Sequence, residues 1–144
     1  MTSIRARAVE AAIDLLATEG LRALTHARID QHADLPKGST SNYFRTRQAL
    51  LTGVVDAIVE RELPQVDGAM SLDSPAELVE AMCGVFEHIT TADRKVTTAR
   101  LVLFVEASHN IALRAALSRG REAMETLGVV ALARFGVLER RAHA

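Results

Sequence analysis

The chain has 144 residues, of which 49% are hydrophobic and 24% are charged. This length suits one domain, or one small domain fused to a second, and the apolar content excludes a disordered or collagen-like chain. The single cysteine excludes an internal disulfide, and a net charge of −1 provides no general attraction to nucleic acid.

Residue usage favours helices over strands. Ala, Leu, Arg and Glu are frequent, whereas only 3% of the residues are aromatic and Trp is absent. We therefore predict an all-α fold whose helices pack through aliphatic contacts. The N-terminus lacks the continuous apolar stretch of a signal peptide, and no run approaches the roughly 20 apolar residues that span a bilayer. We expect a cytoplasmic protein.

The first predicted helix starts at Ile4, with apolar residues spaced by three and four. Gly20 ends this helix, because glycine adopts positive-φ cap conformations without a Cβ penalty. A short second helix is predicted after Thr25, which is a good N-cap residue. Leu24 and Ile29 flank that cap at the two positions of a hydrophobic staple.

A third, short helix is predicted from Pro36 to Tyr43. Asp34 tolerates a left-handed turn, and Pro36 suits the first turn of a new helix. Two short helices joined by such a turn form a helix-turn-helix, whose second helix enters the DNA major groove. The outward residues of this second helix are predicted to be small and polar: Lys37, Gly38, Ser39, Ser41 and Asn42.

Longer helices are predicted for the rest of the chain. A fourth helix follows the N-cap Thr46 until Pro64 stops it, and the stretch from 64 to 74 is predicted to be a loop between two halves. A fifth helix starts at Ser74, where an N-cap serine precedes a proline. Later helices are predicted from about residue 93 to 108 and after Asn110, the last one containing two glycines at 120 and 128.

The charges are unevenly distributed along the chain. Residues 1–52 carry seven Arg and Lys against five Asp and Glu, whereas the remainder carries ten against thirteen. The basic character therefore lies at the N-terminal end, where the helix-turn-helix is predicted. Alone, this asymmetry favours nucleic-acid binding only slightly.

Several short motifs around the predicted helix-turn-helix occur together. They are Glu19-Gly20-Leu21, Leu24-Thr25, Ala33-Asp34-Leu35, Lys37-Gly38, Tyr43-Phe44, and Arg47 followed by Ala49-Leu50-Leu51. In order and spacing this segment resembles the N-terminal domain of the tetracycline-repressor (TetR) family. The resemblance implies a DNA-binding domain over residues 1–50 and a helical regulatory and dimerisation domain over residues 51–144. Family members usually continue further, so we expect this second domain to be C-terminally short, lacking at least one dimer helix.

The resemblance also implies phosphate contacts around the second and third predicted helices. Thr25 would meet a phosphate with its hydroxyl or backbone N–H, and His26 would reach a phosphate or a base. Lys37 would attract phosphate together with the dipole of the third helix. Tyr43 would offer its hydroxyl to phosphate, and Arg47 would clamp the DNA backbone.

Base contacts are implied for the residues between these phosphate contacts. Gly38 has no side chain, so its backbone would approach a base edge closely. Ser39, Ser41 and Asn42 would point outward as base readers, since Asn suits a bidentate pair with adenine. One departure from the family is Thr40, which stands where an apolar residue is usual and is expected to weaken one core contact.

The second half is expected to sense a small molecule. Met82, Phe86 and Phe104 could line a cavity for an apolar effector, although we favour plain core positions for them. The function predicted is a sequence-specific transcriptional repressor that binds a palindromic double-stranded DNA operator as a homodimer and is released by such an effector. The alternative is a helical interaction and dimerisation module without a ligand response.

Catalysis is not expected. Cys83 and His88 are five residues apart and diverge by about 140° on a helix, so they cannot form a nucleophile and base pair. Cys83 is expected to be a buried small hydrophobe, and His88 and His109 are isolated. No phosphate-binding loop or zinc signature occurs in the sequence. We therefore predict no cofactor, no metal and no enzymatic activity.

Overall fold

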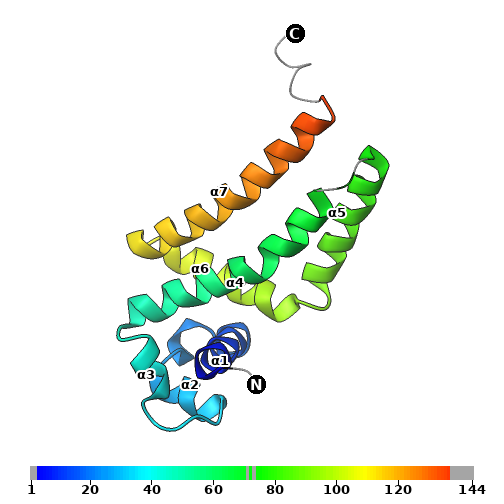
Figure 1. The fold of residues 1–144 in the computed structure, drawn as a ribbon. Coiled ribbons are helices and arrows are strands. Elements are labelled where there is room, and N and C mark those ends of the chain that lie inside the picture. The colour runs from blue at the N-terminus through cyan, green and yellow to red at the C-terminus, as the bar shows by residue number, and fades with distance from the viewer. Residues whose placement is uncertain (1–2, 71, 73, 137–144) are drawn as a thin grey trace.

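A computed structural model describes residues 3–70, 72 and 74–136. Within these ranges all regular structure is helical, which confirms the predicted all-α class. In Figure 1, α1, α2 and α3 gather at one end of the molecule, and the long helix α4 leads from them into the second half. The elements are α1 (Ile4–Glu19), the 3-10 helix η1 (Leu21–Ala23), α2 (His26–His32), α3 (Ser39–Tyr43), α4 (Arg47–Met70), α5 (Pro75–Thr90), α6 (Arg94–Ala107) and α7 (Ile111–Arg134).

Most of the predicted helix ends are confirmed, and a nearby side chain or a glycine caps them. The Thr25 hydroxyl accepts a hydrogen bond from the Arg28 N–H at 3.2 Å, and the Asn110 carbonyl Oδ1 accepts one from Leu113 at 3.0 Å. Gly20 closes α1 with a φ of 78°, as its lack of a Cβ allows. These caps confirm the starts of α2 and α7 and the end of α1.

Two predicted boundaries are wrong. α4 continues through Pro64 to Met70, so the residues after Pro64 are helical and not a loop. A proline inside a helix removes one backbone hydrogen bond, and packing can offset that loss. Here Glu62 is buried before the proline, and Gln65 and Val66 line a partly open pocket after it. The third helix starts at Ser39, three residues later than predicted, because residues 36–38 form a turn.

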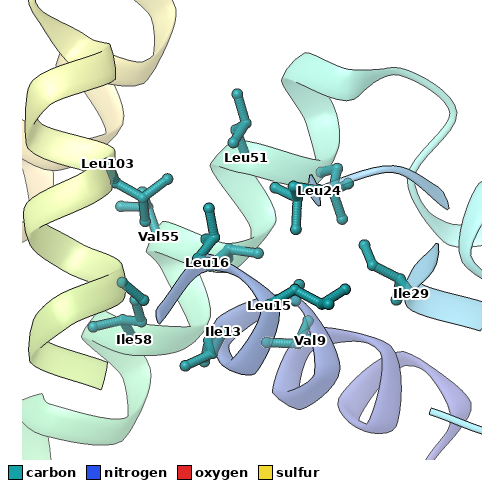
Figure 2. Packing of buried hydrophobic residues seen from close by; sticks show 14 of the residues in the cluster. Val9, Ile13, Leu15, Leu16, Leu24, Ile29, Leu51, Val55, Ile58 and Leu103 are labelled. Atoms are coloured by element: carbon teal, nitrogen blue, oxygen red, sulfur yellow. The ribbon is translucent and has the colours of Figure 1, made fainter. Parts of the chain in front are cut away.

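One buried cluster connects the N-terminal helices with α4, α6 and the start of α7. Figure 2 shows α1 side chains packed against α4 and α6, with Leu15 and Leu16 near its centre. The cluster continues from Leu24 and Ile29 beside α2 to Leu113 on α7. The predicted domain division at residue 50 stays a prediction, and the hydrophobic core extends across that position.

Two glycines allow close packing on α4. A Cβ added to Gly53 would lie 2.3 Å from Cε1 of Phe44, and a Cβ added to Gly120 would lie 2.6 Å from Cγ2 of Val59. Gly53 therefore lets the end of α3 pack on α4, and Gly120 lets α7 approach α4. α4 and α7 form the most extensive helix pair of the described chain.

None of the described helices combines the length and the apolar character that crossing a membrane requires.

Candidate nucleic-acid interface and apolar pocket

The turn between α2 and α3 is held from α1. Asp34 has a φ of 49°, which confirms the predicted left-handed residue. The Arg7 guanidinium donates hydrogen bonds to the backbone carbonyls of Ala33 and Asp34. No local sequence pattern indicates these contacts, because the partners of Arg7 are 26 and 27 residues away.

A buried carboxylate on α2 caps α3. Asp30 is only 4% exposed. Its Oδ2 accepts a hydrogen bond from the Gly38 N–H at 2.7 Å, and its Oδ1 accepts from the Thr40 N–H at 2.8 Å and the Thr40 hydroxyl at 2.6 Å. Burial alone would raise the pKa of Asp30, but the hydrogen bonds from Thr40 and Gly38 hold this pKa below its ordinary value. Thr40 is fully buried, so the predicted weak core contact is replaced by a polar one.

The other end of α3 is also bound to α2. Nε2 of His26 lies 2.6 Å from the carbonyl oxygen of Phe44, the C-cap residue of α3. Because a carbonyl can only accept, this His26 nitrogen carries the proton and donates. The ring that the resemblance placed on DNA is thus used within the protein.

The outward residues of α3 are fewer than the sequence predicted. Ser39 is buried, with 9% of its surface exposed, so the prediction that it points outward is wrong. Ser39 is the first residue of α3, next to the Gly38 N–H that Asp30 of α2 binds. Ser41 is exposed, and its hydroxyl donates to the carbonyl of Gly38 at 2.9 Å.

Several polar side chains at this end are exposed and unpaired, and three of them lie on α3 or directly before it. Lys37, Asn42 and Tyr43 are exposed and make no hydrogen bond or ion pair with the part of the chain that the structure describes. Lys37 precedes α3 in the turn. Gly38 follows with a φ of 90°, which an L side chain rarely adopts, and a Cβ there would meet only Ser41 Oγ at 3.8 Å. The backbone at Gly38 is therefore open to close approach.

Arg47 faces the protein. Its Nη1 donates to the carbonyl of Leu24 at 2.6 Å and its Nη2 to the carbonyl of Leu21 at 2.9 Å. These carbonyls belong to η1 and the residue after it, just before Thr25. Arg47 thus fixes the start of α2 from the first turn of α4.

An ionic cluster connects this end with α6. The Asp14 carboxylate on α1 pairs with Lys95 of α6 and, at 2.9 Å, with Nε2 of His32 of α2. The hydrogen bond from Lys95 outweighs partial burial and lowers the pKa of Asp14 below its ordinary value. A second set of contacts joins Arg61 of α4 to Asp93 at 2.9 Å, directly before α6.

The second half contains a cavity of about 290 Å³. Helices α4 to α7 all contribute to its wall, which is mainly apolar and includes Val59, Leu103 and Met124. Three charged side chains contribute to the wall: Glu62 of α4 and Arg100 of α6 form an ion pair, and Arg121 of α7 is the third. Burial lowers the pKa of the Arg100 guanidinium.

The predicted lining residues are only partly found at this cavity. Phe104 contributes to the wall, whereas Met82 and Phe86 do not, and α5 presents Val85 and Ile89 instead. Phe86 is 59% exposed and Phe104 53% exposed, so the expectation of plain core positions is wrong for both. Cys83 on the same helix is exposed, not buried as expected. α5 lies at the edge of the molecule in Figure 1, which explains why only part of its apolar surface is covered.

No group of three or more His, Cys, Asp or Glu side chains that could hold a metal ion is found among the described residues.

A helix-turn-helix joined by one long helix to a second helical unit with its own cavity defines a class of helical regulatory proteins. Residues 73–144, half of the chain, match the family model described as tetracyclin repressor-like, C-terminal domain. The chain therefore belongs to the tetracycline-repressor family of transcriptional regulators, as the N-terminal motifs predicted. This family consists of regulators, which agrees with the prediction that the chain is not an enzyme.

Solved structures share the fold. SCO7518 from Streptomyces coelicolor A3(2), a candidate transcriptional regulator, matches with a TM-score of 0.75 and 21% identity over 88% of this chain and 73% of its own. The multidrug-binding protein EbrR, solved in complex with ethidium, matches with a TM-score of 0.72 and 27% identity over 97% of this chain and 80% of its own. Comparison with curated proteins gives no match.

Proposed function

We propose that this chain binds double-stranded DNA sequence-specifically by placing α3 in the major groove. The observation that carries the proposal is a group of exposed, unpaired side chains on α3 and directly before it, Lys37, Asn42 and Tyr43. Most other polar groups of α2 and α3 are used within the protein, so these three are available for a partner. A cation, an amide and a phenol suit phosphate and base edges.

Roles follow from the position of each group. Lys37 and Tyr43 contact phosphates on either side of α3, and the Thr25 hydroxyl, which accepts from Arg28, keeps its own proton to donate to a third. Asn42 reads a base edge, and the open backbone at Gly38 allows the helix to approach.

Three residues that the resemblance assigned to DNA support this surface from within. His26 binds the end of α3, Ser39 is buried at its start, and Arg47 fixes the segment before Thr25.

The proposal is tested with the salt dependence of DNA binding. We expect Lys37→Ala to lower the slope of log affinity against log salt by about two per dimer, since one phosphate contact is lost in each subunit. Arg134→Ala is the matched control, because Arg134 ends α7, at the opposite end of the molecule from α3 in Figure 1. Asn42→Ala should relax sequence preference with little change in slope. Equal slopes for the wild type and Lys37→Ala would remove Lys37 from the interface.

We further propose that two copies bind a two-fold symmetric operator, with recognition helices about 34 Å apart in successive major grooves. Exposed apolar side chains on α7, at Val129, Val130 and Leu132, are available to a second copy. Sedimentation of the protein with DNA should give two chains per site. One chain on an unpaired half-site would contradict dimeric binding.

The cavity supports the effector part of the proposal. A mainly apolar wall with the Glu62–Arg100 ion pair and Arg121 suits a lipophilic molecule with a charged group, and the similar protein EbrR was solved with ethidium. An effector acts as an inducer of a repressor only if it binds the DNA-free conformation more tightly. A hundredfold loss of operator affinity requires about 2.7 kcal/mol of such preference.

Tetraphenylphosphonium is the probe we would use for this part, since ethidium intercalates into DNA and would disturb a release assay. We expect it to raise the melting temperature and to weaken DNA binding, and Phe104→Ala should reduce both effects. Phe86→Ala is the matched control, because Phe86 is equally exposed but lies outside the cavity wall. A probe that stabilises the protein without weakening DNA binding would favour the alternative, a packing and interaction module without a ligand response.

A further inference from the structure

The recognition helix α3 has little apolar packing of its own. Its five residues are Ser, Thr, Ser, Asn and Tyr, and the two that are buried are Ser39 and Thr40. A helix this short is not stable by propensity alone, so contacts with its neighbours must hold it. Gly38, its N-cap, supplies no side-chain hydrogen bond.

The contacts that replace a local cap come from one face of α2. Asp30 and His26 are four residues apart and thus lie on the same face of that helix. Asp30 accepts hydrogen bonds from Gly38 and Thr40 at the start of α3, whereas His26 donates to Phe44 at its end. We propose that Asp30 and His26 are positioning residues for DNA binding, which clamp α3 at both ends in the orientation that presents Lys37 and Asn42.

The contacts of Asp30 at the start of α3 are stronger than the contact of His26 at its end. The carboxylate receives three hydrogen bonds, and a buried acceptor of this kind forms charge-assisted bonds that are stronger than neutral ones. An amide in place of the carboxylate could not accept on both sides, so an N–H group would be left facing another donor. The consequence is local: α3 should lose order while the α1 and α4 core remains intact.

The expected effect on DNA affinity rests on the proposed DNA-binding function. The expected effect on the order of α3 does not. We would therefore measure amide hydrogen exchange in the full chain first. In the wild type, the N–H groups of Gly38 and Thr40 should be protected. Asp30→Asn should remove that protection while amides of Leu15 and Val54 keep theirs.

A matched pair at Thr40 separates the polar contact from packing. Thr40→Val keeps the shape but loses the hydroxyl donor, and Thr40→Ser keeps the donor but loses a methyl group. We expect Thr40→Val to lose protection in the same direction as Asp30→Asn but to a smaller extent, because the two backbone N–H groups still donate to Asp30, and Thr40→Ser to resemble the wild type. The reverse order, with Val tolerated and Ser not, would show that packing alone positions α3 and would overturn the proposal. This pair also decides the matter if Asp30→Asn does not fold.

The same variants are then compared for binding to a mixed-sequence DNA duplex at low salt. If loss of the clamp leaves α3 ordered in one chain in ten, the apparent affinity falls about tenfold for each subunit that binds. The salt slope should stay unchanged, because no phosphate contact is removed. At the C-terminal end of α3, His26→Gln retains a hydrogen-bond donor and should therefore bind DNA more tightly than His26→Ala. Neither variant should change the slope of log affinity against log salt. A slope lowered by His26→Ala would make His26 a phosphate contact.

The two failures are distinguishable. If the wild type does not bind DNA, the proposed function fails, and the exchange data still show whether the clamp exists. If protection at Gly38 and Thr40 is the same in all variants, the clamp is absent whatever the DNA binding.

Discussion

Replacing Gly53 by Ala tests the packing that joins the recognition helix to α4. In the structure, the missing Cβ of Gly53 makes room for the ring of Phe44, which is buried and follows α3 directly. A methyl group there would lie 2.3 Å from Cε1 of that ring, well inside van der Waals contact. The ring would have to move, and the end of α3 with it.

The magnitude follows from two opposing effects. Overpacking of this kind costs typically about 1–3 kcal/mol. Replacing glycine by alanine inside a helix contributes about 1 kcal/mol in the other direction. The net expectation for Gly53→Ala is therefore a loss of roughly 0–2 kcal/mol in the free energy of unfolding.

A control on the same helix isolates the packing effect. Gly68 also lies in α4, and a Cβ there would meet nothing within 4 Å. Gly68→Ala should therefore stabilise the protein by about 1 kcal/mol. Because both variants share the propensity gain, the difference between them, about 1–3 kcal/mol, measures the clash alone.

Urea denaturation of the wild type and both variants gives the two free energies. Gly53→Ala should also weaken DNA binding, since Phe44 carries the carbonyl that His26 binds. If both variants were stabilised equally, the close packing of Phe44 on Gly53 would be refuted.

Further predictions concern single side chains. The pKa values of the Asp30 and Asp14 carboxyls are lowered from 3.8, so both carboxylates stabilise the fold fully above that pH. This stabilisation is lost as the pH falls through the lower folded-state pKa values. Asp30→Asn lacks one of these carboxylates, so its urea midpoint should fall less between pH 5 and pH 3 than that of the wild type. Arg47→Ala should cost about 1–2 kcal/mol of unfolding free energy, because two backbone carbonyls lose their donor, and an unchanged midpoint would contradict this role. The Cys83 thiol is exposed and should react with a thiol reagent in the folded monomer at nearly the rate of the unfolded chain; strong protection in dilute protein would show that it is covered.

Local contacts explain why the helix starts were predictable. Thr25, Thr46 and Asn110 each cap a backbone N–H three residues away, so the sequence window that contains the cap also contains its partner. The left-handed turn at Asp34 was predictable for the same reason, because residue type and the following proline suffice.

The supports of the candidate site were not predictable in this way. The hydrogen-bond partners of Arg47 and Asp30 lie 23 and 10 residues away, and nothing in a local pattern pairs them. A buried Asp30 next to a buried Thr40 leaves a weak signal: two polar residues at positions where helix periodicity predicts apolar ones. The α5 residues of the cavity wall were predicted incorrectly, because several apolar residues lie along the same side of this helix. Only the positions of the neighbouring helices determine that Val85, and not Met82, lines the cavity.

The central claim is that α3 and the turn before it contact DNA. It is tested most directly by titrating the isotope-labelled full chain with a short mixed-sequence duplex at low salt and following backbone amide shifts by NMR. The account predicts the largest shifts for Lys37 to Tyr43 and around Thr25, with small changes in α5 and α7. Binding that shifts α5 and α7 and leaves residues 37–43 unaffected, or no binding at all, would contradict it.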